Sequence, residues 1–105
     1  GEFVATYTSK VLYRGAASTT TTTTLYTVPS ATTTVVTDIM VANTAGTSAS
    51  FTMYLNGTVI AQTVTVGAYD TTVIPCKQVL VATNTIQGGA SATTVNFSIS
   101  GVEVS

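Results

Sequence analysis

The 105-residue sequence contains no histidine and no tryptophan, and it has a single cysteine, Cys76. Histidine is the commonest general base and the commonest metal ligand, so its absence removes most hydrolase arrangements. One cysteine cannot form an intramolecular disulfide, and without histidine it cannot complete the ligands of a structural zinc ion. The sequence therefore predicts no catalytic residue, no metal site and no cofactor.

Charged side chains are also scarce, at 7% of residues against about 25% in ordinary soluble domains. The three cations are scattered, whereas phosphate binding needs clustered Lys and Arg, so no nucleic acid is expected as a partner. No apolar run approaches the roughly 18 residues that a membrane-spanning helix needs, so no membrane partner is expected either. Three acidic residues fall on separate predicted strands or loops, and only a pocket that gathers them would favour an enzyme: Asp38, Asp70 and Glu103.

Threonine is the abundant residue, with 25 copies in the chain. Its hydroxyl is the main polar group left to face water, since the mean hydropathy is positive at +0.46. Threonine is β-branched and favoured on pleated sheets, while no segment keeps helical apolar spacing over three turns. The composition therefore predicts an all-β protein.

Alternation of period two is clearest near the C-terminus. Val95, Phe97 and Ile99 alternate with small polar residues, which places three apolar side chains on one face of a strand. After Gly101 the apolar series continues one residue out of step, in Val102 and Val104. A β-bulge at Gly101 would return both valines to the inner face, so a bulge is predicted there.

The sequence Asn56-Gly57 gives the strongest local prediction. Asn-Gly tolerates the positive φ values of a type I′ turn, so residues 50–56 and 57–66 should form a hairpin. Residues 34–43 are apolar on both faces, which indicates a central strand. Pro29 and Pro75 are expected to lie at strand ends, because proline cannot donate to a sheet ladder.

These patterns together predict seven to nine short strands, and hence an antiparallel β-sandwich of immunoglobulin-like or jelly-roll type, with a small β-barrel as the alternative. A single domain is expected over residues 4–105, with residues 1–3 a cloning remnant. The remaining strands are expected at 5–14, 23–28, 71–75, 78–82, 84–88 and 93–104.

Two features admit a structural and a functional interpretation. The six threonines Thr19–Thr24 favour an extended edge strand, after a loop at Gly15–Ser18, over a glycosylated or adhesive tract. Cys76 favours a small buried hydrophobic residue over a reactive thiol activated by the neighbouring Lys77.

The small number of charges bears on association. Some outward positions, on the central strand and near Tyr54, must be apolar, and exposed apolar patches mark interfaces, so a homo-oligomer is predicted. Tyrosines can supply such a surface, although they can equally cap the edge of a core. The candidate interface residues are Tyr26, Tyr54, Val64, Val66 and Tyr69.

Six segments in order resemble small virion proteins of tailed bacteriophages. They are Val11–Gly15, Thr24–Pro29, Thr34–Thr44, Phe51–Gly57, Thr85–Ser91 and Val95–Glu103. The threonine tract departs from the pattern, and no functional residue is carried over.

The resemblance implies a non-enzymatic β-sandwich on the phage particle surface or tail, as a capsid decoration, head-fibre or tail-fibre component. It also implies a trimer and contacts with other virion proteins. The alternative is a receptor- or carbohydrate-binding tip module of a phage fibre.

Overall fold

The computed structural model describes residues 4–105, so the expected cloning remnant at residues 1–3 lies outside the described residues. The described chain forms eight strands and, within that range, no helix that could cross a membrane. The strands are β1 (Tyr7–Ala16), β2 (Thr24–Thr27), β3 (Thr33–Asn43), β4 (Ala49–Leu55), β5 (Thr58–Val66), β6 (Thr71–Leu80), β7 (Thr85–Ala90) and β8 (Val95–Val104).

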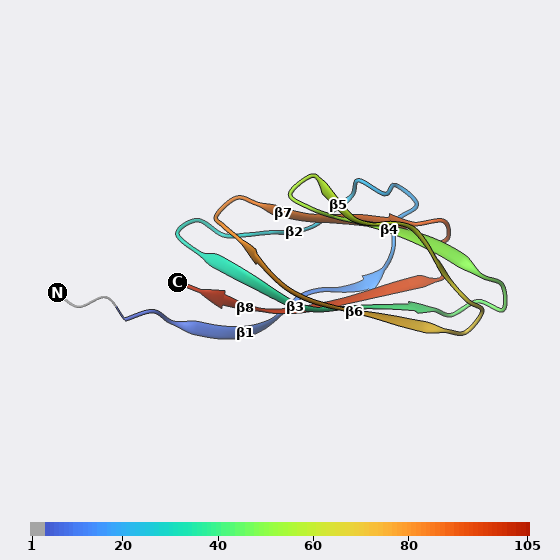
Figure 1. Ribbon diagram of the computed structural model, residues 1–105, viewed down its shortest axis with the longest axis horizontal. Helices are drawn as coiled ribbons and strands as arrows, with labels where there is room; N and C mark the ends of the chain where they lie inside the picture. Colours follow the sequence, from blue (N-terminus) through green and yellow to red (C-terminus); the bar gives the residue numbers. More distant parts are fainter. Residues whose placement is uncertain (1–3) are drawn as a thin grey trace.

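The strands make two four-stranded antiparallel sheets that pack face to face (Figure 1). Sheet A has the order β1-β8-β3-β6, and sheet B has the order β2-β7-β4-β5. The pairing is nested, since β1 pairs with β8, β2 with β7, β3 with β6 and β4 with β5. This is the jelly-roll topology. The predicted sandwich is confirmed, in its jelly-roll form rather than as an immunoglobulin-like domain or a closed barrel.

The innermost pair of this nest is the hairpin predicted from Asn56-Gly57. Leu55 pairs with Thr58 across the turn, and Asn56 and Gly57 adopt φ angles of 47° and 80°. Two consecutive positive φ angles are those of a type I′ turn, whose twist matches the flanking strands. The predicted hairpin is therefore confirmed.

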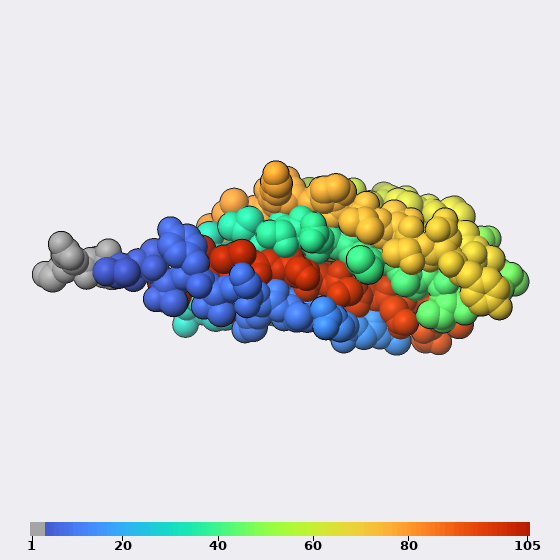
Figure 2. Space-filling model, turned by 90° about the horizontal axis from the view of Figure 1, so that it is seen from below, coloured from blue at the N-terminus to red at the C-terminus, as the bar shows by residue number. Residues whose placement is uncertain are grey.

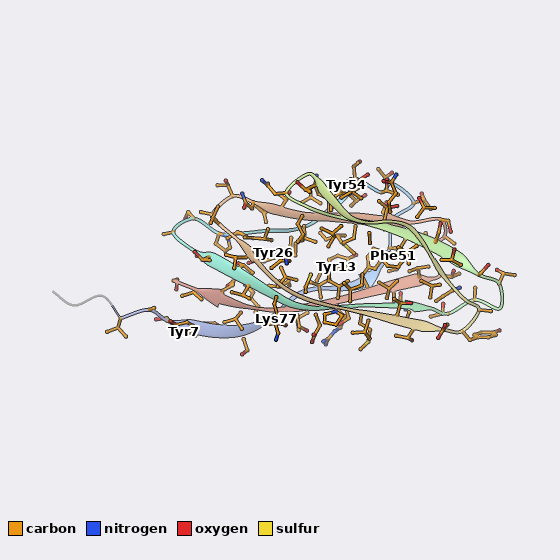
Figure 3. All side chains as sticks on the ribbon, in the orientation of Figure 1. Tyr7, Tyr13, Tyr26, Phe51, Tyr54 and Lys77 are labelled. Atoms are coloured by element: carbon orange, nitrogen blue, oxygen red, sulfur yellow. The ribbon has the colours of Figure 1, made fainter. Side chains whose placement is uncertain are left out.

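The core lies between the sheets and is built from alternating side chains. Phe97 and Ile99 enter it from β8, and Phe51 enters from β4 on the opposite sheet. The Phe51 and Phe97 rings meet edge to face, with centroids 6.2 Å apart (Phe51 is labelled in Figure 3). The strand predicted as central, β3, lies inside sheet A between β8 and β6.

The predicted bulge at Gly101 is wrong. Register shifts occur beside this residue, but the extra residues are on the neighbouring strands, at Leu12 of β1 and Thr37 of β3. Strand β8 therefore keeps its alternation: Gly101 takes a buried inner position, and Val102 faces the outside of sheet A. Glu103, and not a valine, takes the next inner position.

Strand β6 was predicted as two strands interrupted at Pro75, but it is continuous. Pro75 lies opposite Asp38 in the ladder to β3. β6 is an edge strand of sheet A, where a missing N–H on the solvent side removes no ladder bond. The chain instead shifts register two residues later, where Lys77 has a φ of 50°.

The threonine tract is mostly a loop, so the predicted edge strand over Thr19–Thr24 is wrong except at Thr24, where β2 begins. Strand β1 also continues through Gly15, past the predicted end. The loop hydrogen-bonds to β7, because the carbonyls of Ser18 and Thr23 accept from the N–H groups of Ala90 and Gly88, both at 2.9 Å. These bonds satisfy β7 where β2 is too short to pair with it.

Candidate functional site

The five candidate interface residues do not form one surface. Tyr54 is half-buried on sheet B, whereas Tyr69 is 77% exposed in the loop between β5 and β6. Tyr26 points between the sheets, and Val64 is half-buried against the core (Tyr26 and Tyr54 are labelled in Figure 3). Tyr69 is thus the only one of the five with a largely free side chain.

Val66 is 1% exposed and belongs to the core, so its expected place on an outer surface is wrong. The register between β4 and β5 shifts twice, and Thr63 has a φ of 48°. Each shift adds one residue to β5, and the two shifts cancel in the alternation, so Val64 and Val66 keep the inward phase set by the pair of buried Leu55 with Thr58. Alternation counted from the hairpin turn therefore indicates inward positions for both valines.

Tyr26 is the centre of a polar cluster at the end of the sandwich where the two chain ends lie. Its hydroxyl donates to the Glu103 carboxylate and accepts from the Thr34 hydroxyl at 2.8 Å. Lys10 Nζ lies 3.3 Å from both carboxylate oxygens of Glu103. The cluster joins sheet B to sheet A. Tyr26 therefore serves as an internal connection, and its assignment as an interface residue is corrected.

The cluster changes the acidity of both partners. Burial and the hydrogen bond to Glu103 raise the pKa of Tyr26 to about 12. The hydrogen bond from Tyr26, aided by Lys10, lowers the pKa of the Glu103 carboxyl. The ionised carboxylate and the neutral phenol are consequently the forms that the fold stabilises.

These shifts predict a loss of stability at both extremes of pH. Glu103 stabilises the fold above its unfolded pKa of about 4.3, and this contribution is lost as the pH falls through the folded value. Tyr26 stabilises the fold below pH 10, and this contribution is lost as the pH rises from 10 towards about 12. Urea unfolding over a pH series should show both declines.

Tyr26→Phe should flatten both declines, because it removes the phenol and the hydrogen bond that keeps the Glu103 pKa low. Tyr7→Phe deletes the same atom from a side chain that is 72% exposed, and it is the matched control. Equal pH profiles for the wild type and Tyr26→Phe would contradict the role of the cluster.

An apolar surface does exist on the outer face of sheet A, in two groups of side chains with the row of Asp38 between them. Three valines of neighbouring strands lie side by side, since Val35 pairs with Val79 on one side and Val102 on the other. Met40 pairs with Val73 two rows further along. We call this surface the apolar face, and it comprises Val11, Val35, Met40, Val73, Val79 and Val102.

Figure 2 looks onto the apolar face, where β1, β8, β3 and β6 run as neighbouring bands from blue through red and green to yellow. The exposed fractions are 45% for Met40, 51% for Val73 and 62% for Val79. Arg14 and Asp38 bring charge of opposite sign to this side of the sheet. The expectation of apolar outward positions on the central strand is confirmed at Met40 and Val35.

Two shallow hollows lie on the same side of sheet A, with volumes of about 250 and 410 Å³. Met40 and Ala42 line the first, and Val11 and Val102 line the second. Neither hollow is lined by a carboxylate or a tyrosine. Arg14 lines the first hollow and Lys10 the second, so each adds a cation to its apolar and hydroxyl contacts.

The remaining reactive groups lie apart. Across residues 4–105, no three Cys, Asp or Glu side chains are close enough to share a metal ion. Asp70 is in the loop before β6, where it accepts from the N–H of Thr71. Burial, with the nearby Asp38 charge, raises the pKa of the half-buried Cys76 thiol, which favours the packing interpretation over the reactive one.

Fold and surface together define a jelly-roll β-sandwich domain that presents an apolar sheet face with few charges. Neither a protein-family model nor a curated protein matches the chain.

Proposed function

We propose that the chain is a non-enzymatic structural domain of a bacteriophage virion, a component of the capsid decoration, head fibre or tail fibre. It assembles with copies of itself and with other virion proteins through the apolar face. The observation that carries this proposal is the exposure of Met40, Val73 and Val79 on neighbouring strands of one sheet. The resemblance over six segments supplies the virion context.

The chemistry of the apolar face suits permanent contact with protein. Monomeric proteins rarely leave contiguous apolar patches of more than a few hundred Å² in water. Between the valines lie hydroxyl groups such as those of Ser98 and Ser100, which lose less on burial than charged groups do. A partner can thus cover the face without having to neutralise many ions.

The jelly roll is also a recurrent architecture of viral capsid proteins, although it occurs in lectins and cupins as well. The alternative of a carbohydrate-binding tip receives less support. The tyrosines that would stack on a sugar are dispersed, with Tyr26 internal, Tyr54 on sheet B and Tyr69 in a loop. They do not surround either hollow.

Immunoelectron microscopy tests the virion assignment directly. An antibody against the chain should label intact particles of the phage that encodes it, at positions repeated with the symmetry of the head or tail. Labelling confined to lysate, with none on purified particles, would reject the proposal.

The role of the apolar face is tested by Met40→Lys, which replaces one of its exposed apolar side chains with a charged one. We expect this variant to lose binding to purified particles, measured by co-sedimentation, and to form smaller assemblies of copies than the wild type, measured by light scattering after size exclusion. Val59→Lys is the matched control, because Val59 is 42% exposed but lies on β5 of sheet B. Equal association of the two variants would exclude the apolar face as the contact.

A further inference from the structure

The two sheets have four edge strands, and three of them carry features that obstruct pairing with another chain. β6 contains Pro75 and the positive φ of Lys77. β5 contains two register shifts and the positive φ of Thr63. β2 has only four residues. Bulges, prolines and short edges are the usual means by which proteins prevent edge-to-edge association.

Strand β1 is the exception. It is ten residues long and lacks proline, and its register shift at Leu12 leaves Tyr7–Val11 regular. Its outer edge has no partner strand in sheet A. An exposed regular edge of this kind is a template for another strand.

The direction of the free backbone groups on β1 follows from its pairing with β8. Thr6 and Ser105 exchange two hydrogen bonds, at 2.8 and 3.0 Å. In an antiparallel ladder the bonded residues alternate, so every second residue from Thr6 faces β8 with its backbone groups. Tyr7, Ser9 and Val11 therefore direct their N–H and C=O groups away from the sheet.

We propose that β1 pairs antiparallel with β1 of a second copy, across a two-fold axis at Ser9. This register places Ser9 opposite Ser9 and Tyr7 opposite Val11. Each residue whose backbone N–H and C=O groups point away from β8 therefore meets another such residue. The two A sheets then join into one eight-stranded sheet. The inference goes beyond the proposed function and does not rest on the virion assignment.

Side-chain chemistry agrees with this register. Tyr7 and Val11 are 72% and 45% exposed, and an aromatic residue opposite a β-branched one is a favourable cross-strand pair. Lys10 faces Thr8 of the other copy, so no two cations are opposed along the regular part of the strand. An axis at Leu12 would place Lys10 against Arg14 and would run through the irregular part of the strand.

The symmetry follows from the contact. An antiparallel pairing of two identical strands about a two-fold axis is isologous, so the assembly closes at two copies. The edge contact therefore generates a dimer, and not the three-fold order that the resemblance implies.

Cysteine cross-linking tests the register in the otherwise intact chain. Ser9→Cys, with Cys76→Ala to remove the native thiol, should form a disulfide-linked dimer under mild oxidation. Facing residues of a hydrogen-bonded pair have Cα atoms about 5.5 Å apart, within the disulfide range of about 4.4–6.8 Å. Tyr7→Cys in the same background is the control, because its two copies would lie about 13 Å apart. Cross-linking of Ser9→Cys no faster than the control would overturn the proposal.

Ser9→Pro supplies a second measurement. The Ser9 N–H points away from β8, so proline removes a bond between copies and none within the chain. In the Met40→Lys background, which removes contacts through the apolar face, light scattering should give a monomer for Ser9→Pro and a dimer for Ser9→Ala, which keeps the N–H. A dimer for both variants, or a monomer for both and for their Met40→Lys parent, would overturn the edge contact. If proline prevents folding, the cross-linking rates decide, and particle labelling still tests the virion assignment separately.

Discussion

Phe97→Ala is expected to lower the free energy of unfolding by about 3–5 kcal/mol. The side chain is 1% exposed and meets Phe51 of the opposite sheet edge to face. Its removal loses the transfer free energy of the ring and opens a cavity between two sheets whose spacing other side chains maintain. Neighbouring strands cannot collapse into that cavity without breaking the ladders on both sides of β8.

Urea denaturation measures this loss, with an unchanged dependence on denaturant as the sign that the folded state is retained. Val79→Ala is the control, because it also truncates an apolar side chain of sheet A but at a position 62% exposed. A loss below about 1 kcal/mol for Phe97→Ala would place the ring outside the core and refute the inward facing of β8.

Gly101→Ala should lower the free energy of unfolding by about 2–3 kcal/mol, although it adds a single methyl group. A Cβ at this position would lie 2.5 Å from the Val35 carbonyl oxygen and 2.8 Å from Leu12 Cδ1. The first of these atoms belongs to the backbone of β3, which is held by ladders to β6 and β8. The clash can therefore be relieved only by moving a central strand.

Gly67→Ala is the matched control for this substitution. The nearest atoms to a Cβ there belong to Asp70 and lie at 3.7 Å, an ordinary contact distance. Thermal or urea unfolding should separate the two variants clearly. A Gly101→Ala protein as stable as the control would mean that β8 shifts phase at this residue, as the alternation alone suggests.

Features that depend on neighbouring residues in the sequence were predicted well. The hairpin at Asn56-Gly57 and the alternation around Phe97 are set by local backbone preferences and by one buried face. The doubly apolar run of β3 indicated a central strand for the same reason. These elements, together with the abundance of threonine, were sufficient for the all-β sandwich.

Features that depend on the partner strand were missed. The phase break after Gly101 was visible, but whether the extra residue lies on β8 or on its neighbours is decided by Leu12 and Thr37. Pro75 could be placed inside a strand only with the knowledge that β6 is an edge. The threonine tract has strong strand propensity, yet it forms a turn. The carbonyls of Ser18 and Thr23, at either end of this turn, accept hydrogen bonds from β7, and this contact cannot be read from the tract itself.

The sequence predicted that an apolar outer surface exists, but it located only some of the residues on that surface. Scarcity of charge implied that some outward face is apolar, and Met40 lies on it as expected of the central strand. The sequence did not indicate that Val73 and Val79 belong to this surface. Division of β6 into two strands at Pro75 hid the outer face that it shares with β3. Tyr26 was assigned outward because its polar partner across the sandwich cannot be read from spacing, whereas the inward position of Val66 follows from alternation counted from the hairpin turn.

The nested pairing also determines when, during synthesis, each strand can meet its partner. Of the eight strands described, β1 is made before the other seven, and its one partner in sheet A, β8, is made after the other seven. From the synthesis of Tyr7 until that of Val104, the nascent β1 has both edges unsatisfied, while the β4–β5 hairpin can already close. An emerging β1 therefore stays unpaired along both edges until the rest of the sandwich has been made.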